Sequence, residues 1–265
     1  MSKEIAQKKA TDVVVHQGFE DLAGAGFSEV STEDLAIPFI RILAQLSPQV
    51  NKREGAYVEG AEAGMIFNTV LNDAYDGEQG IKVIPCHYNR RMVEWRQRDQ
   101  GGGYVDSYQP DDPYCSTATR DERGQDVLPN GNILTNTAQF FVLMLHPELG
   151  PQRALIAMSS TQLKKSRKWL SQMQALTAKG KNGVFVLPMM SQVYTLTSVA
   201  ESNDKGSWFG WEVSRDRQLD LDTEDDLFDM AVAFAQSVKE GDVKVKQEKE
   251  VEVKSTDLPD EGDFM

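Results

Sequence analysis

Seven basic residues lie in a stretch of the chain that contains no acidic residue. Between Glu148 and Glu201 the sequence holds Arg153, Lys164, Lys165, Arg167, Lys168, Lys179 and Lys181, and no Asp or Glu. Each cation that neutralises a phosphate releases condensed counterions, whereas a carboxylate nearby would repel the phosphate. The pattern favours a site for a polyanion. The alternative is a solvated basic face that balances an acidic region of the same molecule.

A second cluster mixes arginines with aromatic residues. It comprises Tyr88, Arg90, Arg91, Trp95, Arg96 and Arg98, followed by Tyr104 and Tyr108. On a strand, alternate side chains share a face, which places Tyr88 and Arg90 on one side and Arg91 and Trp95 on the other. Aromatic rings that stack bases beside arginines that follow the backbone suit single-stranded nucleic acid. Alternatively, Trp95 enters the core and the arginines keep the surface soluble.

The remaining reactive side chains do not form an enzyme motif. The sequence lacks a phosphate-binding P-loop, a nucleophile elbow, a zinc-protease helix and a dinucleotide fingerprint. We therefore expect no enzyme, no catalytic residue and no cofactor. Cys86, His87, Cys115 and His146 lack the close pairing of zinc ligands, so we expect no metal, and free thiols are the simpler interpretation. Further candidate stacking platforms, although such residues more often belong to the core, are Trp169, Trp208, Phe209 and Trp211.

Charge and hydropathy limit the class of protein further. The 265-residue chain has a net charge of -13, which by itself argues against a nucleic-acid binder, but most of that acidity lies in residues 201–265. No apolar run approaches the ~20 residues of a membrane helix, and the first residues lack the apolar centre of a signal peptide. Two cysteines are too few for a disulfide framework. We expect a protein of the cytoplasm that does not engage a membrane.

Hydrophobic periodicity predicts a mainly β chain of the α+β class. Strands are expected at 65–71, 80–88, 91–98, 136–145, 153–159, 183–190, 193–199 and 207–213, with helices at 160–179 and 223–240. Leu35 to Pro48 shows helical spacing of Ile40, Leu43 and Leu46. Strands, then a helix, then strands is the element order of an OB-type, partly open barrel, and a generic α+β domain fits nearly as well.

The composition divides the chain into three parts. Residues 1–34 are polar and glycine-containing, and we expect a flexible N-terminal arm. Residues 35–240 form the OB-like domain, with a long loop at 99–135. Residues 241–265 form a disordered acidic tail, because alternating charge cannot bury enough apolar surface to fold.

The end of the tail combines acids with a few apolar groups. Its candidate partner-binding residues are Asp257, Leu258, Pro259, Asp260, Glu261, Asp263 and Phe264. An acidic flexible segment with a near-terminal aromatic can fill an apolar pocket ringed by bases on a partner, or compete for the chain's own basic groove. The alternative is a solubilising end.

Together these features resemble the divergent single-stranded-DNA-binding proteins of tailed bacteriophages. The resemblance rests on the barrel order of residues 64–215, on Ser159 to Trp169 with Tyr88 to Arg98, and on Leu258 to Met265. The tail differs from the bacterial type because Met265 follows Phe264. The resemblance implies sequence-independent binding of single-stranded DNA in phage replication, recombination or repair, in the host cytoplasm, with the tail recruiting replication and recombination proteins.

The interface implied in this way consists of Tyr88, Arg90, Arg91, Trp95, Arg96, Arg98, Tyr104, Tyr108, Lys164, Lys165, Arg167, Lys168, Lys179 and Lys181. Two other functions remain open. A strand-annealing recombination protein, acting as a homo-oligomer, would present a similar surface. A structural or assembly protein would use the basic helix against another protein.

Overall fold

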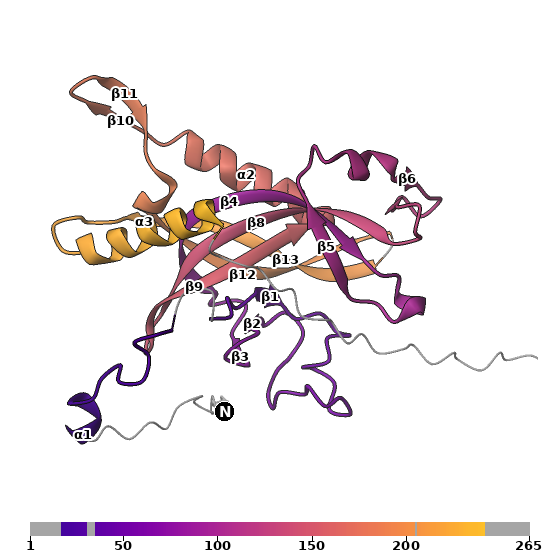
Figure 1. The fold of residues 1–265 in the computed structure, drawn as a ribbon, viewed down its shortest axis with the longest axis horizontal. Coiled ribbons are helices and arrows are strands. Elements are labelled where there is room, and N and C mark those ends of the chain that lie inside the picture. The colour runs from indigo at the N-terminus through magenta and orange to yellow at the C-terminus, as the bar shows by residue number, and fades with distance from the viewer. Residues whose placement is uncertain (1–16, 31–34, 205, 242–265) are drawn as a thin grey trace, which may run out of the picture.

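The computed structural model describes residues 17–30, 35–204 and 206–241 (Figure 1). The long strands are β4 (Ile81–Trp95), β8 (Ile133–His146), β9 (Gly150–Ser159), β12 (Gln192–Asn203) and β13 (Gly206–Gln218). The longer helices are α2 (Leu163–Gln174) and α3 (Asp225–Glu240), and α1 spans Gln17–Glu20. The shorter strands are β1 (Ile40–Ile42), β2 (Ile66–Asn68), β3 (Asp73–Tyr75), β5 (Tyr104–Tyr108), β6 (Thr119–Arg120), β7 (Asp126–Val127), β10 (Thr177–Gly180) and β11 (Gly183–Val186).

The five long strands form one strongly curved antiparallel sheet. β4, β8 and β9 follow one another as a meander, and β12 then pairs with the other edge of β4 through Tyr194 and Val83. β13 lies outside β12 along its whole length. The resulting order β9-β8-β4-β12-β13, with α2 between β9 and β12 in the chain, is compatible with the OB-like, partly open barrel predicted from the sequence.

A small sheet of β1, β2 and β3 lies against both free edges of this barrel. Phe39 forms a parallel bridge with Leu155 of β9. Next to the start of β4, the amide of Ser198 in β12 donates to the carbonyl of Gly77, in the loop that follows β3. Gly64 has φ +92°, and a Cβ there would come within 2.7 Å of the Phe209 ring of β13. The small sheet and its adjoining loops therefore contact both β9 and β13.

Alternate residues of the central strands belong to two separate hydrophobic cores. Phe140 lies in the core that α2 covers, together with Trp169, whereas Phe141 lies in the core that α3 covers, together with Phe234. The strand β8 is consequently buried on both faces, and α2 and α3 contact opposite sides of the sheet. A bulge between Pro85 and His87 shifts the register of β4 in the way that a proline in a strand requires.

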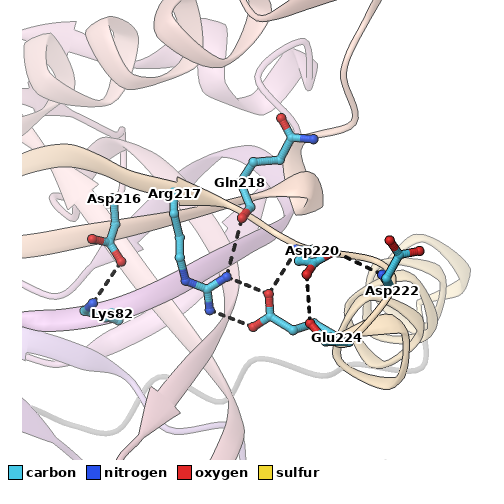
Figure 2. Close-up of polar contacts among 8 residues, drawn as sticks. Lys82, Asp216, Arg217, Gln218, Asp220, Asp222 and Glu224 are labelled. Atoms are coloured by element: carbon cyan, nitrogen blue, oxygen red, sulfur yellow. Dashed lines mark hydrogen bonds and ion pairs between the residues drawn. The ribbon is translucent and has the colours of Figure 1, made fainter.

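The start of α3 is joined to the end of β13 by a charged turn (Figure 2). Both guanidinium nitrogens Nη1 and Nη2 of Arg217 lie 2.6 Å from the two carboxylate oxygens of Glu224. Glu224 also accepts from the Asp220 amide, and Asp220 accepts from Thr223. Hydrogen bonding from Arg217 holds the pKa of Glu224 below its usual range. Through these contacts, the carboxylates of Asp220 and Glu224 anchor the start of α3 to the end of β13.

Three sequence predictions of local structure were wrong. Residues 35–48 do not form a helix: Ile40 begins β1, and Leu46 is 76% exposed. The helix predicted at 160–179 ends at Gln174, and the chain then forms the β10–β11 hairpin. The segment 99–135, predicted as a loop, contains β5, β6 and β7. In each case pairing with a distant or following segment overrode the local pattern.

Candidate nucleic-acid interface

A groove of about 870 Å³ lies between α2 and the β12–β13 hairpin. Its basic residues are Lys164, Lys165 and Lys168 of α2. The opposite wall carries Trp208 of β13, and the acidic residues in the groove are Glu201 and Glu212. The groove therefore combines three of the predicted phosphate-contacting lysines with three predicted stacking tryptophans, of which Trp169 and Trp211 are buried and Trp208 is partly exposed.

The packing of α2 determines which of its side chains face this groove. Trp169 is 1% exposed and stacks on Phe140, with ring centroids 4.4 Å apart, so this tryptophan belongs to the core. With Trp169 and Met173 turned inward, Lys164 and Lys168 remain exposed one helical turn apart on the same face. Arg167 is exposed on the same helix but does not line the groove.

Spatial neighbours change the charge of this region. Residues 149–200 contain no acid, but the carboxylate of Glu201 forms an ion pair with Lys165. Glu212 of β13 also lines the groove. A count of charge along the sequence could not place either acid beside these lysines, because both belong to the β12–β13 hairpin that packs against α2. Among the described residues, Lys164 and Lys168 have no acidic partner.

A second hollow, of about 490 Å³, lies on the opposite face of the sheet, beside the end of α3. It is lined by Arg91, Tyr104 and Tyr108 from the predicted interface, together with Asn89, Gln139 and Phe141. The amides and phenol rings can contact base edges and faces, and Arg91 can contact phosphate. The structure thus distributes the predicted residues over two faces rather than one.

The other predicted residues of the arginine-aromatic cluster occupy different positions along β4. Tyr88 is half-buried and packs its ring against Phe140, 5.1 Å between centroids, on the face covered by α2. Arg90 donates to the side chain of Asn136. Trp95 is partly exposed and meets Tyr104 edge-on, and Arg96 is exposed. Arg98 begins a short 3-10 turn, and its side chain lies outside the described residues.

Lys179 and Lys181 lie on the β10–β11 hairpin, which projects from the end of α2 (Figure 1). Both lysines are exposed. The same hairpin exposes Val184 (73%), Phe185 (49%) and Val186 (55%). These two lysines therefore belong to an apolar arm and not to the α2 groove.

A buried carboxylate positions Tyr108 at the second hollow. Glu94 is 2% exposed and accepts hydrogen bonds from the Tyr108 hydroxyl at 2.6 Å, from Asn130 at 2.8 Å and from Asn132. Burial alone would raise the pKa of Glu94, but these hydrogen bonds outweigh burial and the pKa lies below its ordinary value. Glu94 thus ties the excursion 99–132 to β4.

Replacing Glu94 with Gln should lower the free energy of unfolding at pH 7 by about 1–3 kcal/mol, because an amide cannot accept all three hydrogen bonds. The folded-state pKa of Glu94 is depressed, so its contribution is complete above the ordinary value of 4.5 and disappears as the pH falls through the folded-state pKa. Urea titrations at pH 7 and pH 3 measure this. Glu122→Gln, an exposed acid in the same excursion, is the control. An equal stability loss at both pH values would contradict the assignment.

The candidate metal ligands are not brought together. Among the described residues, no group of three or more His, Cys, Asp or Glu side chains is arranged to hold a metal ion. Cys86 is a buried free thiol, and burial raises its pKa to about 12, whereas Cys115 is partly exposed. The helices that the structure describes include none long and apolar enough to span a bilayer. The tail residues from Asp257 to Phe264 lie outside the described residues.

The curved sheet, its two covering helices and the lysine-lined groove define a mainly β protein of the α+β class that presents a basic groove. The chain belongs to the Pam3 phage gp34-like protein family, whose model matches residues 7–244. This match supports a phage origin. No curated protein and no solved structure matches the chain.

Proposed function

We propose that this phage-family protein binds single-stranded DNA without reading its sequence and acts in phage DNA replication, recombination or repair. The observation that carries the proposal is the α2 groove, where Lys164 and Lys168 lie opposite Trp208. Lysines contact phosphates irrespective of sequence, and every base has a face that can stack on an indole. In this proposal the protein is not an enzyme, and its acidic tail recruits partner proteins.

The hollow beside α3 supports the same function from the other face. It places Arg91 beside Tyr104 and Tyr108, which is again a cation next to aromatic rings. In OB-type barrels, the connection between the first two strands contributes to oligonucleotide binding. Here that connection is the excursion between β4 and β8, which contains both tyrosines.

Titration of the protein with a fluorescent 20-nucleotide oligo(dT) at several salt concentrations tests the proposal. We expect binding at 50 mM salt. The logarithm of the association constant should fall linearly as log[salt] rises, by about 0.7 per phosphate contact. Oligo(dA) and oligo(dC) of the same length should bind with similar affinity. Absence of binding at 50 mM salt, or binding that salt does not weaken, would refute the proposal.

An assembly role is a second candidate, favoured by the exposed apolar hairpin. An isolated two-stranded ribbon is marginally stable in water, and Val184, Phe185 and Val186 are exposed in this protein. Such a surface suits contact with another protein or another copy of the chain. Sedimentation with and without oligo(dT) distinguishes the candidates, since an assembly protein would associate without DNA and ignore the oligonucleotide.

A further inference from the structure

One acidic side chain accepts hydrogen bonds from several donors that line the proposed DNA groove. Three donors converge on the carboxylate of Glu201: the ammonium of Lys165, the indole Nε1 of Trp208 at 2.8 Å and the amide of Gln162 at 3.3 Å. They come from α2, β13 and the turn that precedes α2. A carboxylate and a phosphodiester each present two oxygens that share a negative charge, so the same donors suit both groups.

The backbone leaves room for this arrangement at Gly210 of β13. A Cβ on Gly210 would lie 2.4 Å from the Glu201 carboxylate oxygen and 2.7 Å from the Gln162 amide nitrogen. A side chain at this position would therefore displace the cluster of Glu201 and Gln162. Gln162 is held in turn, because its side-chain oxygen accepts from the Trp211 amide. Of the three donors, Gln162 is thus held by the fold independently of Glu201.

Glu201 is held but remains able to leave. The side chains of Lys165 and Glu201 are 26% and 25% exposed, so the carboxylate can rotate into water without being buried unpaired. Burial would raise the pKa of Glu201, but hydrogen bonds from Lys165, Trp208 and Gln162 outweigh burial and the pKa lies below its usual value. Glu201 is therefore ionised at neutral pH and competes with any other anion for these donors.

We propose that the donors around Glu201 form a phosphate-binding subsite of the groove, which the Glu201 carboxylate fills until the DNA backbone displaces it. This inference rests on the proposed function. Of the three groove lysines, Lys165 alone is paired with an acid of the described chain, whereas Lys164 and Lys168 remain available for the first contacts. Displacement of Glu201 then adds Lys165 and the Trp208 N–H to the bound backbone.

The substitution Glu201→Gln tests this subsite, since it removes the charge and keeps an oxygen that can accept from Trp208. In the wild type, the contact of Lys165 with phosphate is offset by the Glu201 carboxylate that is left unpaired. The variant lacks this offset, which should steepen the salt slope for oligo(dT) by about 0.7. If affinities converge near 1 M salt, the same slope makes the variant roughly eightfold tighter at 50 mM. Adding Lys165→Ala to Glu201→Gln should abolish both effects.

Glu212→Gln is the matched control, because Glu212 lines the same groove and carries the same charge but its side chain forms no hydrogen bond or ion pair with the residues that the structure describes. It reports the general gain from removing one negative charge. Equal gains in the two variants, an unchanged slope for Glu201→Gln, or a gain that survives Lys165→Ala would each overturn the subsite. If the wild type binds and Glu201→Gln is no tighter, the subsite alone fails. If no variant binds at 50 mM salt, the proposed function fails with it.

Discussion

Replacing Lys164 and Lys168 together with alanine should weaken binding of single-stranded DNA about tenfold or more at 50 mM salt. The two lysines lie one helical turn apart on the groove wall, and neither has an acidic partner among the described residues. Loss of two phosphate contacts should lower the salt slope by about 1.4. The ratio of wild-type to variant affinity should therefore be roughly sevenfold smaller at 200 mM than at 50 mM salt. Fluorescence anisotropy with oligo(dT) measures both quantities.

Arg167→Ala provides the control for this prediction on the same helix. Arg167 is exposed and basic but does not line the groove, and it donates to the carbonyl of Leu163. Its removal changes the net charge by one without removing a groove contact, so we expect a smaller loss with little change in slope. If Arg167→Ala costs as much as the double variant, binding follows the general charge of α2 and the groove is not the site.

Much of the framework was predictable because strand alternation and helix periodicity are local signals. The long strands β4 and β8, the start of α2 and the whole of α3 follow from such patterns. The alternation along β4 correctly separated Tyr88 from Arg91, since the two side chains contact opposite faces of the sheet. Local periodicity could not show that a helix on each face would divide the expected interface into two.

One failure arose because a partner distant in sequence decides the structure, and another because a local turn signal was missed. Ile40 and Leu43 fit a helical spacing equally well, but β1 pairs with β2, and Leu43 packs with Phe67. The end of α2 shows a missed local signal, since Gly180 and Gly183 flank a two-residue turn before the β-forming Val184. A hairpin was the better prediction there.

The candidate site shows the same division between local and distant information. The run of bases between residues 149 and 200 correctly indicated α2 as a basic surface. The pairing of Lys165 with Glu201 depends on β12 and β13 folding onto α2, which no count along the chain contains. Whether a tryptophan can stack on a ligand or packs in the core likewise depends on the tertiary fold. Trp169 is buried in the core, whereas Trp208 is partly exposed in the groove.

Trp169→Ala should lower the free energy of unfolding by about 3–5 kcal/mol, while Trp208→Ala should change it by about 1 kcal/mol or less. Trp169 is 1% exposed, stacks on Phe140 and meets Tyr194 edge-on at 5.5 Å, so its loss opens a large cavity. Trp208 is half-buried on the groove wall. Loss of one stacked base at Trp208 should weaken oligo(dT) binding by about 1–3 kcal/mol.

Trp208→Phe separates the ring of Trp208 from its N–H. Phenylalanine can still stack a base but cannot donate to Glu201, so the variant should retain most of the wild-type affinity that Trp208→Ala loses. Urea unfolding and oligo(dT) titration of all three variants give the comparison. A Trp208→Phe variant as weak as Trp208→Ala would assign the effect to the hydrogen bond rather than to stacking. Affinity retained in Trp208→Phe would instead show that a base contacts the face of the ring, because phenylalanine keeps a ring but lacks the N–H that donates to Glu201.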